Sequence, residues 1–500
     1  MTEGRPTVAS GDAEVEPSLR SRVARGVRWG GLDQVVQAVV RLGVMVTLAR
    51  LISPSDVGLM GMVWVVVNLL SVLTGLGLGE ALVQRTDLRP AHTAVAFTAS
   101  AVTGVVLAGL TAAAAQPVSH LFGQRRLVPL LLAMTVVFLA SGIERTPNDM
   151  LVRDFRFREF YLSSTIAAVA GAVVGVVLAV LGHGVWALVW MAVTEAVTAS
   201  ALAWTFALRA RVWRPALSMD AAAFRDLIGY GANVTGARLV AYGQSNGDNL
   251  IVGKALGPTA LGYYALAYRT MLMPISKVAK VIGSTAFPAF AAVQHDLARL
   301  RTGFVRANRY VALVCFPVTI GLSVTAPVLV PVAFGEQWRP AVPVVQLLAL
   351  AGPFISITSL DNTLYEGVGR PRLGLRLALV ELALYLPAFL IGVQFGVEGV
   401  AVGLLISGYG TLPLLFTVRA RILQTDMASQ LGPFVPLVLG TAVMALAATA
   451  VRHLLPESTP DAATLALMAG SGAAVYLVAI RLLAPALFAG VRRDLMRTSS

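Results

Sequence analysis

The chain has 500 residues, of which 57% are hydrophobic and only 13% are charged, and its mean hydropathy is +0.75. Soluble domains are about half apolar and about a quarter charged, so this composition excludes a water-soluble globular protein and favours a helical membrane protein. The net charge is +13, and the single cysteine, Cys315, excludes an intrachain disulfide and a cysteine-based metal cluster.

The first predicted element is a polar tail over residues 1–28, which ends in the basic run LRSRVARGVR. Apolar stretches follow it, each about 18–25 residues long and able to cross a bilayer as a helix. They are residues 29–52, 57–78, 93–116, 127–143, 161–181, 185–207, 227–254, 261–287, 310–334, 342–361, 375–394, 399–418, 434–451 and 463–484. We therefore predict an all-α polytopic membrane protein with about 14 transmembrane helices and short connections.

Lysine and arginine residues indicate the orientation. With the amino terminus inside, 27 of the 39 lysines and arginines lie on inside segments, 6 lie on outside segments and 6 lie within helices. This distribution follows the positive-inside rule and predicts that both chain ends are cytoplasmic. It also accounts for most of the net charge, so no nucleic acid is needed as a partner.

A short motif recurs in the chain. Residues 51–58 read LISPSDVG and residues 256–262 read LGPTALG, so that Pro54 matches Pro258 and Gly58 matches Gly262. Each copy lies near the start of a block of six predicted helices, as in transporters built from parallel repeats. The alternative is two unrelated turns, because proline–glycine turns are common between helices. The predicted domains are a tail at 1–28, six-helix bundles at 29–218 and 219–418, two extra helices within 419–484, and a tail at 485–500.

The stretch YRTMLMPISKVAKVIG, residues 268–283, carries three cations inside an apolar region: Arg269, Lys277 and Lys280. At 100° per residue they fall within about a quarter of the helix circumference. A charge at mid-membrane costs about 3 kcal/mol, so such residues usually face a bundle interior or a wet cavity. We interpret the three as binding an anionic group in a central lumen. The alternative is that the lysines extend to the inner membrane surface.

Two other predicted helices carry a polar stripe. The stripe in 29–52 consists of Gln34, Gln37 and Arg41, and the stripe in 227–254 consists of Arg238, Tyr242, Ser245 and Asn249. Their spacings of three and four residues place each set on one helix face. We predict that both faces line the lumen and that Arg41 and Arg238 bind substrate. Interhelical hydrogen bonds or an internal ion pair are the alternative.

Four acidic residues lie within predicted helices: Asp33, Glu195, Asp248 and Glu381. Such carboxylates are candidates for coupling transport to H⁺ or Na⁺, since the cost of burying them depends on protonation or ion binding. Pairing with the cations described above is the alternative interpretation.

Enzyme motifs are absent from the sequence. It contains no HExxH, GxSxG or Walker motif, and its five histidines are scattered over loops and helix ends. We therefore expect no catalysis, no cofactor and no metal.

The segment ERTPNDMLVRDFRFREFY, residues 144–161, interleaves aromatic residues with arginines and predicts contact with anionic lipid head groups.

The stretch LARLISPSDVGLMGMVWVVVNLLSVLTGLGLGEALVQR, residues 48–85, resembles the opening of bacterial polysaccharide exporters. These are the Wzx-type lipid-linked oligosaccharide flippases of the MOP superfamily, and the likeness is closest to exporters of the colanic or teichuronic acid type. The resemblance implies a MATE-like pair of six-helix bundles around a central cavity. It also implies alternating access and an undecaprenyl-pyrophosphate-linked oligosaccharide as the substrate for polysaccharide export.

The resemblance further implies a location in the bacterial cytoplasmic membrane. Expected partners are the lipid-linked oligosaccharide, membrane lipids, H⁺ or Na⁺ and the polysaccharide polymerase machinery. An ion-coupled multidrug exporter and a lipid II flippase of the same superfamily remain alternatives. A membrane glycosyltransferase or polymerase is disfavoured because every outer loop is short, and a scaffold that only binds is the last alternative.

Overall fold

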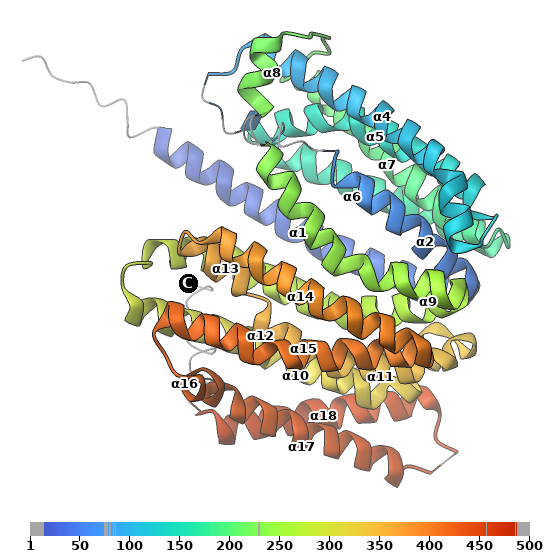
Figure 1. The fold of residues 1–500 in the computed structure, drawn as a ribbon, viewed down its shortest axis with the longest axis vertical. Coiled ribbons are helices and arrows are strands. Elements are labelled where there is room, and N and C mark those ends of the chain that lie inside the picture. The colour runs from blue at the N-terminus through green and yellow to red at the C-terminus, as the bar shows by residue number, and fades with distance from the viewer. Residues whose placement is uncertain are drawn as a thin grey trace, which may run out of the picture. The chain divides into compact units, whose positions relative to one another are not determined.

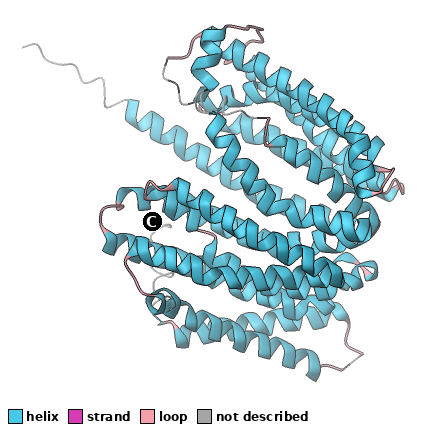
Figure 2. Ribbon diagram, viewed as in Figure 1, coloured by secondary structure: helices cyan, strands magenta, loops and turns pink. Residues whose placement is uncertain are grey.

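The computed structural model describes residues 15–74, 79, 82, 83, 85, 87–228, 231–456, 458–485 and 487, but not the side chains of 15–28, 32, 225–228, 231–241, 244 and 245. Every regular element in this part of the chain is a helix (Figures 1 and 2). The α-helices are α1 (Val15–Leu51), α2 (Pro54–Ser71), α4 (Pro90–Phe122), α5 (Leu127–Arg153), α6 (Phe157–Val180), α7 (Val185–Arg209), α8 (Ala221–Ile228), α9 (Gly231–Ala292), α10 (Leu297–Phe334), α11 (Val342–Leu350), α12 (Gly352–Thr358), α13 (Asp361–Gly367), α14 (Pro371–Gly392), α15 (Gly396–Leu423), α16 (Met427–Leu431), α17 (Val435–Leu454) and α18 (Asp461–Leu483). Three 3₁₀ helices are η1 (Glu336–Ala341), η2 (Val393–Phe395) and η3 (Gly432–Phe434).

Within the described residues, eleven helical stretches are long and apolar enough to cross a membrane. One of them, Pro371–Leu423, contains both α14 and α15 and so covers two predicted spans. Helix α9 is not among the eleven, although the predicted span 261–287 lies within its bounds and the predicted span 227–254 overlaps it. The total of 14 therefore stays a prediction.

Two predicted spans differ in form from the observed helices. Residues 342–361 form two short helices, α11 and α12, in place of one, and α13 begins at Asp361. Pro353 lies in the first turn of α12, where it removes an amide donor that a continuous helix would need. Residues 231–254 and 261–287, from two predicted spans, belong to one element, α9, whose two arms meet at Gly257. That residue has a φ of 81°, which glycine adopts readily and which breaks the helical path.

The chain forms two compact units. Unit 1 comprises residues 1–52 and 66–239, and unit 2 comprises residues 53–65 and 240–500. The first turns of α2 therefore belong to unit 2 and its remainder to unit 1. The predicted domain boundaries at 28, 218, 418 and 484 stay predictions.

The same helix-ending turn occurs six times in the described residues, and four of the six lie at matching places in the two units. Phe155 (φ 56°) and Arg211 (φ 55°) occupy the left-handed region in unit 1, as Gly369 (φ 71°) and Gln424 (φ 49°) do in unit 2. After each of them, the next amide donates to the carbonyl five residues earlier, which is the hydrogen bond of a Schellman motif. Gly369 follows Phe155 by 214 residues, and Gln424 follows Arg211 by 213 residues. The repeated turns support an internal repeat.

In unit 1, α4 packs on α5, α5 and α6 each pack on α7, and α1 packs on α6. Three aromatic rings hold the ends of α4 and α7 together. The ring centroid of Phe97 lies 5.7 Å from that of Trp204 in α7 and 5.1 Å from that of Trp213, which follows α7. Helices α4 and α5 approach closely at Gly104, where a Cβ atom would lie 2.7 Å from the Phe138 carbonyl oxygen. Small residues at such crossings permit the close helix packing that membrane proteins use.

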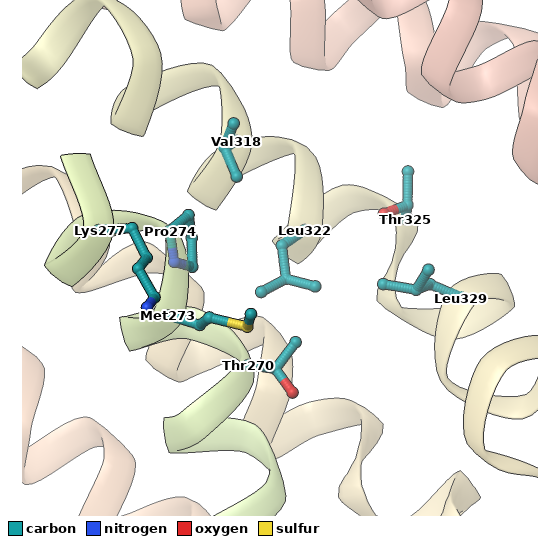
Figure 3. A pocket seen from close by; sticks show the side chains of 8 residues that line it. All are labelled: Thr270, Met273, Pro274, Lys277, Val318, Leu322, Thr325 and Leu329. Carbon is teal, nitrogen blue, oxygen red and sulfur yellow. The ribbon is translucent and has the colours of Figure 1, made fainter. Parts of the chain in front are cut away.

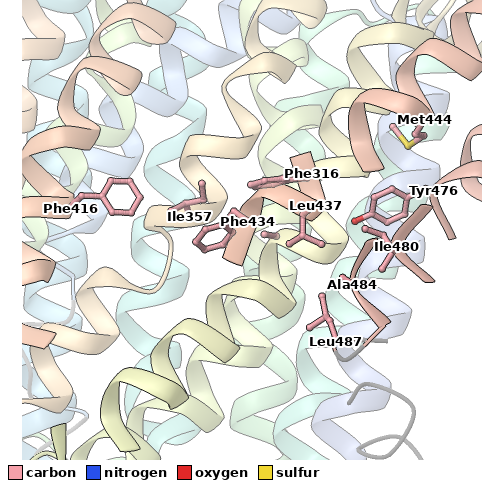
Figure 4. Close-up of a cluster of buried hydrophobic side chains, with 11 residues drawn as sticks. Phe316, Ile357, Phe416, Phe434, Leu437, Met444, Tyr476, Ile480, Ala484 and Leu487 are labelled. Atoms are coloured by element: carbon pink, nitrogen blue, oxygen red, sulfur yellow. The ribbon is translucent and has the colours of Figure 1, made fainter. Parts of the chain in front are cut away.

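Unit 2 has its largest described apolar cluster where α17 and α18 pack on α10 (Figure 4). Phe316 of α10 stacks on Phe434, with ring centroids 6.3 Å apart. Leu437, Met444 and Ile480 fill the space beside them, and each is at most 5% exposed. The last two helices are therefore an integral part of unit 2.

Prolines inside helices leave backbone carbonyls without their usual amide donors, and aromatic side chains replace two of these donors. Pro147 removes the partner of the Ile143 carbonyl, which accepts a 2.9 Å hydrogen bond from Trp204 Nε1. Pro317 does the same to the Leu313 carbonyl, which accepts a 2.8 Å bond from Tyr476 Oη. Neighbouring helices commonly satisfy such groups in membrane proteins.

We expect Trp204→Phe and Tyr476→Phe each to lower the free energy of unfolding by about 1–3 kcal/mol, because each strands a carbonyl that proline has already deprived of its amide. Thermal unfolding in detergent measures the effect. Tyr263→Phe is a control, because among the described residues Tyr263 makes a ring contact with Trp338 and its hydroxyl satisfies no proline-exposed carbonyl. Equal losses in all three variants would contradict the argument.

Unit 2 also contains a reciprocal crossing between α2 and the second arm of α9. A Cβ atom at Gly58 would collide with the Pro258 carbonyl, and a Cβ atom at Gly262 would collide with the Pro54 carbonyl. The two glycines are the matched pair of the repeated sequence motif. The motif therefore serves helix–helix contact as well as the turn.

Candidate functional site

A polar network in unit 1 contains four of the predicted site residues, namely Asp33, Gln37, Arg41 and Glu195. Asp33 of α1 is 6% exposed and accepts hydrogen bonds from Gln37 Nε2 (2.9 Å), Ser164 Oγ (3.1 Å) and Thr165 Oγ1 (2.5 Å). Ser164 and Thr165 belong to α6, so the carboxylate joins two helices. All three of these donors are neutral hydroxyl or amide groups.

Arg41 extends this network to α7. Its Nη2 donates to Gln37 Oε1 at 3.0 Å and lies 3.9 Å from Glu195 Oε1. The side chain of Arg41 is 64% exposed and that of Glu195 is 43% exposed, so screening weakens this long ion pair. Gln34 is also exposed, on the same helix. An exposed side chain is one not covered by protein, so in a membrane span it meets lipid or water.

Asp248 is the most deeply buried of the four acidic candidates. It is 2% exposed on the first arm of α9 and accepts a 2.7 Å hydrogen bond from Tyr264 Oη on the second arm. The Asn249 amide also donates to it at 2.7 Å. Tyr264 stacks on Tyr268 at a centroid distance of 6.0 Å. No described lysine or arginine forms an ion pair with Asp248.

The remaining residues of the predicted stripe on α9 differ in setting. Tyr242 donates its hydroxyl to the Val65 carbonyl of α2, which makes it a helix–helix contact. Asn249 is partly buried. Arg238 and Ser245 lie outside the described side chains. Glu381 is partly buried on α14.

The three cations of residues 268–283 lie on the uncovered side of α9. Arg269, Lys277 and Lys280 are exposed. Met271 and Ile275, on the other side of the helix, are at most 1% exposed. The three cations therefore lie on an exposed face of α9, which an outside ligand can reach.

The sequence analysis did not predict the buried ion pair of unit 2. Arg419 Nη2 donates to Asp361 Oδ2 at 2.7 Å and to the Ile357 carbonyl at 2.8 Å, and Arg419 Nε lies 2.6 Å from Asp361 Oδ1. The guanidinium also lies over the rings of Phe416 and Phe304, 4.8 and 5.5 Å from their centroids. Hydropathy places both charges only at the ends of predicted spans, because nothing in the sequence links positions 58 residues apart.

The arginines of residues 144–161 have protein partners in the structure. Arg145 pairs with Asp149 at 3.2 Å, and Arg156 pairs with Asp154 at 3.1 Å. Arg153 donates to the carbonyls of residues 82, 83 and 85, and the Arg158 guanidinium lies 5.7 Å from the ring centre of Trp29. These contacts give the segment a structural role in unit 1 beside the predicted lipid contact.

Outside the membrane-spanning segments, Asp220 caps α8. Its Oδ1 accepts hydrogen bonds from the amides of Ala223 and Ala222, at 3.1 and 2.9 Å. These bonds to the charged form lower the pKa of Asp220. The carboxylate thereby stays ionised where the link between α7 and α9 begins a new helix.

Comparison with known proteins adds to this geometry. The family described as "Polysaccharide biosynthesis protein" matches residues 47–343. The chain is 25% identical to the lipopolysaccharide biosynthesis protein WzxC of Escherichia coli K12 over 390 residues, 78% of this chain and 79% of that protein. It is 24% identical to the teichuronic acid biosynthesis protein TuaB of Bacillus subtilis 168 over 380 residues, 76% of this chain and 78% of that protein. It is 26% identical to the succinoglycan biosynthesis transport protein ExoT of Rhizobium meliloti 1021 over 357 residues, 71% of each chain.

Solved structures share the fold. The lipid II flippase MurJ, in an inward closed conformation, aligns with a TM-score of 0.74 at 14% identity, over 92% of this chain and 99% of that one. An inward-facing MATE-family multidrug transporter of the MOP superfamily aligns with a TM-score of 0.60 at 16% identity, over 77% of this chain and 94% of that one. At these identities the likeness establishes the fold. The predicted MATE-like, all-α membrane fold is thus confirmed.

Proposed function

Because the chain belongs to the polysaccharide biosynthesis protein family, we propose that it is a flippase that moves a lipid-linked oligosaccharide across the cytoplasmic membrane for polysaccharide export. The family match includes the stretch 48–85 on which the sequence resemblance rested, and the resemblance is confirmed. The substrate class we propose is an oligosaccharide carried on undecaprenyl pyrophosphate.

The observation that carries this proposal is the family match over residues 47–343. Three relatives are named for the biosynthesis of different polymers, namely lipopolysaccharide, teichuronic acid and succinoglycan, and one of them is named a transport protein. A step common to such polymers is the passage of a sugar-bearing precursor across the membrane. Transport leaves the substrate unchanged chemically, so the proposal needs no catalytic group or cofactor.

The substrate needs a polar path for its head group and lipid contact for its chain. We propose that alternating access provides this path and that Arg41, Arg238, Arg269, Lys277 and Lys280 bind the pyrophosphate in turn. Arginine supplies forked donors that match phosphate, and lysine supplies a compact charge. The exposure of Arg41, Arg269, Lys277 and Lys280 supports this assignment. The polar groups Gln34, Gln37, Tyr242, Ser245 and Asn249 would meet the sugars.

The acidic candidates divide by their partners. Glu195 lies beside Arg41, whereas hydroxyl and amide groups bind Asp33 and Asp248. A carboxylate bound by neutral donors can gain a proton or a Na⁺ ion without breaking an ion pair, so we favour Asp33 and Asp248 over Glu195 for ion coupling. Glu381 stays a fourth candidate.

We further propose that the flipped product meets polysaccharide-polymerising enzymes on the outer side of the membrane.

Transport of a fluorescent polyprenyl-pyrophosphate oligosaccharide in proteoliposomes tests the proposal. We expect Arg269→Ala and Arg238→Ala each to slow flipping by about tenfold, because each removes a charge-assisted bond to phosphate worth roughly 1.5–3 kcal/mol. Arg481→Ala is the control, since Arg481, like Arg269, is an exposed arginine on a helix. Imposed H⁺ and Na⁺ gradients in the same vesicles test coupling.

Several outcomes would contradict the proposal. Unchanged flipping in both arginine variants would remove the cationic path. Efflux of cationic dyes by the wild type, without oligosaccharide flipping, would identify a multidrug exporter. Preference for lipid II would identify a lipid II flippase, and transfer of sugar to an acceptor would identify an enzyme.

A further inference from the structure

An elongated groove of about 430 Å³ lies between α9 and α10 in unit 2 (Figure 3). Its wall on α9 consists of Thr270, Met273, Pro274 and Lys277, and its wall on α10 consists of Val318, Leu322, Thr325 and Leu329. Each set follows helical spacing, so one face of each helix forms one wall. The volume lies within the usual range of about 300–1,000 Å³ for ligand sites.

Prolines lie at the groove on both helices. Pro274 is part of the wall, and Pro317 precedes the wall residue Val318. Proline removes an intrahelical hydrogen bond and its ring crowds the preceding turn, which prevents ideal close packing of neighbouring helices. The prolines in the sequences of α9 and α10 therefore favour a groove between these two helices.

The walls of the groove are suited to hydrocarbon. Thr270 Oγ1 donates to the Leu266 carbonyl and Thr325 Oγ1 to the Gly321 carbonyl, both at 2.7 Å. Their hydroxyl hydrogens are therefore used within their own helices, and a sugar would find few donors here. Met273 adds a flexible, polarisable surface that adapts to an irregular chain.

Lys277 is the one charged residue of the lining and lies at one end of the groove, near Val318, while Leu329 lies at the other end (Figure 3). Lys277 is 20 residues beyond the break at Gly257, a helical rise of about 30 Å. Gly257 falls in the turn between the predicted spans 227–254 and 261–287, at one membrane surface. The rise of about 30 Å matches the thickness of the bilayer hydrocarbon, so it places Lys277 near the opposite surface, where its ammonium group would meet a lipid phosphate.

We infer that this groove binds a single polyisoprenyl chain, with the chain's phosphate beside Lys277 and its first isoprene units along α9 and α10. One groove with one cation fits a lipid with one chain and one phosphate, whereas a phospholipid brings two acyl chains. This assignment rests on the proposed function and identifies where the carrier lipid of the substrate is held.

Native mass spectrometry of the full-length protein with undecaprenyl phosphate and with phosphatidylglycerol tests the assignment. We expect undecaprenyl phosphate to bind in preference, and Val318→Trp to weaken its binding by about tenfold by filling the groove. Val314→Trp is the matched control on the same helix, because Val314 is 43% exposed, Val318 is 44% exposed, and only Val318 lines the groove. Such exposure lets either site accept tryptophan without displacing the core.

A second pair of variants tests the phosphate contact. We expect Lys277→Gln to weaken binding of undecaprenyl phosphate by about tenfold, since a charge-assisted bond is lost. Lys254→Gln, an exposed lysine on the other arm of α9, should bind as the wild type does.

Equal affinities in Val318→Trp and Val314→Trp, or equal binding of phosphatidylglycerol, would overturn the groove assignment. Unchanged affinity in Lys277→Gln would overturn the phosphate contact. If the wild type flips the lipid-linked oligosaccharide while these variants bind normally, the groove fails and the flippase stands. If the wild type does not flip it, the proposed function fails whatever the groove binds.

Discussion

Asp361→Ala is expected to lower the free energy of unfolding by about 3–5 kcal/mol, because it leaves the Arg419 guanidinium buried without its counterion. Arg419 is 2% exposed and Asp361 is 9% exposed, so water cannot replace the lost partner. The hydrogen bond to the Ile357 carbonyl and the two aromatic rings would remain, but none of them carries a negative charge. Thermal or denaturant unfolding in detergent measures the loss.

A double variant separates the two contributions to this effect. Asp361→Leu with Arg419→Met removes both charges and keeps similar volumes, and should recover most of the stability lost in Asp361→Ala. Glu336→Ala is the control, because it breaks an ion pair whose side chains are 68% and 64% exposed and should cost less than about 1 kcal/mol. A double variant as unstable as Asp361→Ala would show that the charges stabilise unit 2 themselves.

Gly58→Leu and Gly262→Leu are each expected to destabilise the protein by about 3 kcal/mol or more, because the new side chain meets a rigid backbone carbonyl. Each glycine faces a proline of the other helix, Pro258 or Pro54, so neither side can move without shifting a whole helix. Alanine at either position should already cost stability, since even a Cβ atom collides. Unfolding in detergent gives the magnitude, and transport in vesicles should fall with it.

Gly109→Leu supplies the matched control for these variants. Gly109 lies in α4, and a Cβ atom there meets nothing within 4 Å. Leucine also has a better helix propensity than glycine, by roughly 1 kcal/mol, so the control should be neutral or slightly stabilising. If Gly58→Leu behaves like Gly109→Leu, the reciprocal crossing is not a close contact in solution.

Sequence patterns predicted the helical membrane fold well, because apolar length alone identifies most spans. They also predicted which residues share a helix face, such as the exposed Arg269, Lys277 and Lys280. Helix ends and breaks were less accurate. Pro353 divides a predicted span into two short helices, since hydropathy does not register the loss of backbone hydrogen bonds.

Partners across the fold could not be predicted. Periodicity assigns a residue to a face but does not say which helix lies opposite, so Asp33 could not be linked to Thr165 or Asp361 to Arg419. For the same reason the sequence left open whether Arg41 faces a lumen or an acid, and the structure places Glu195 3.9 Å away. Cationic residues are visible in a sequence, whereas their counterions become visible only in three dimensions.

The carbonyls exposed by Pro147 and Pro317 bear on the order of biosynthesis. The residue that satisfies the Ile143 carbonyl is 61 positions later in the chain, and the residue that satisfies the Leu313 carbonyl is 163 positions later. During translation, α5 therefore keeps a carbonyl without a hydrogen-bond donor until α7 has been synthesised, and α10 does so until α18 has been synthesised. Premature termination before Tyr476 would leave α10 permanently incomplete, which would mark the truncated product for quality control.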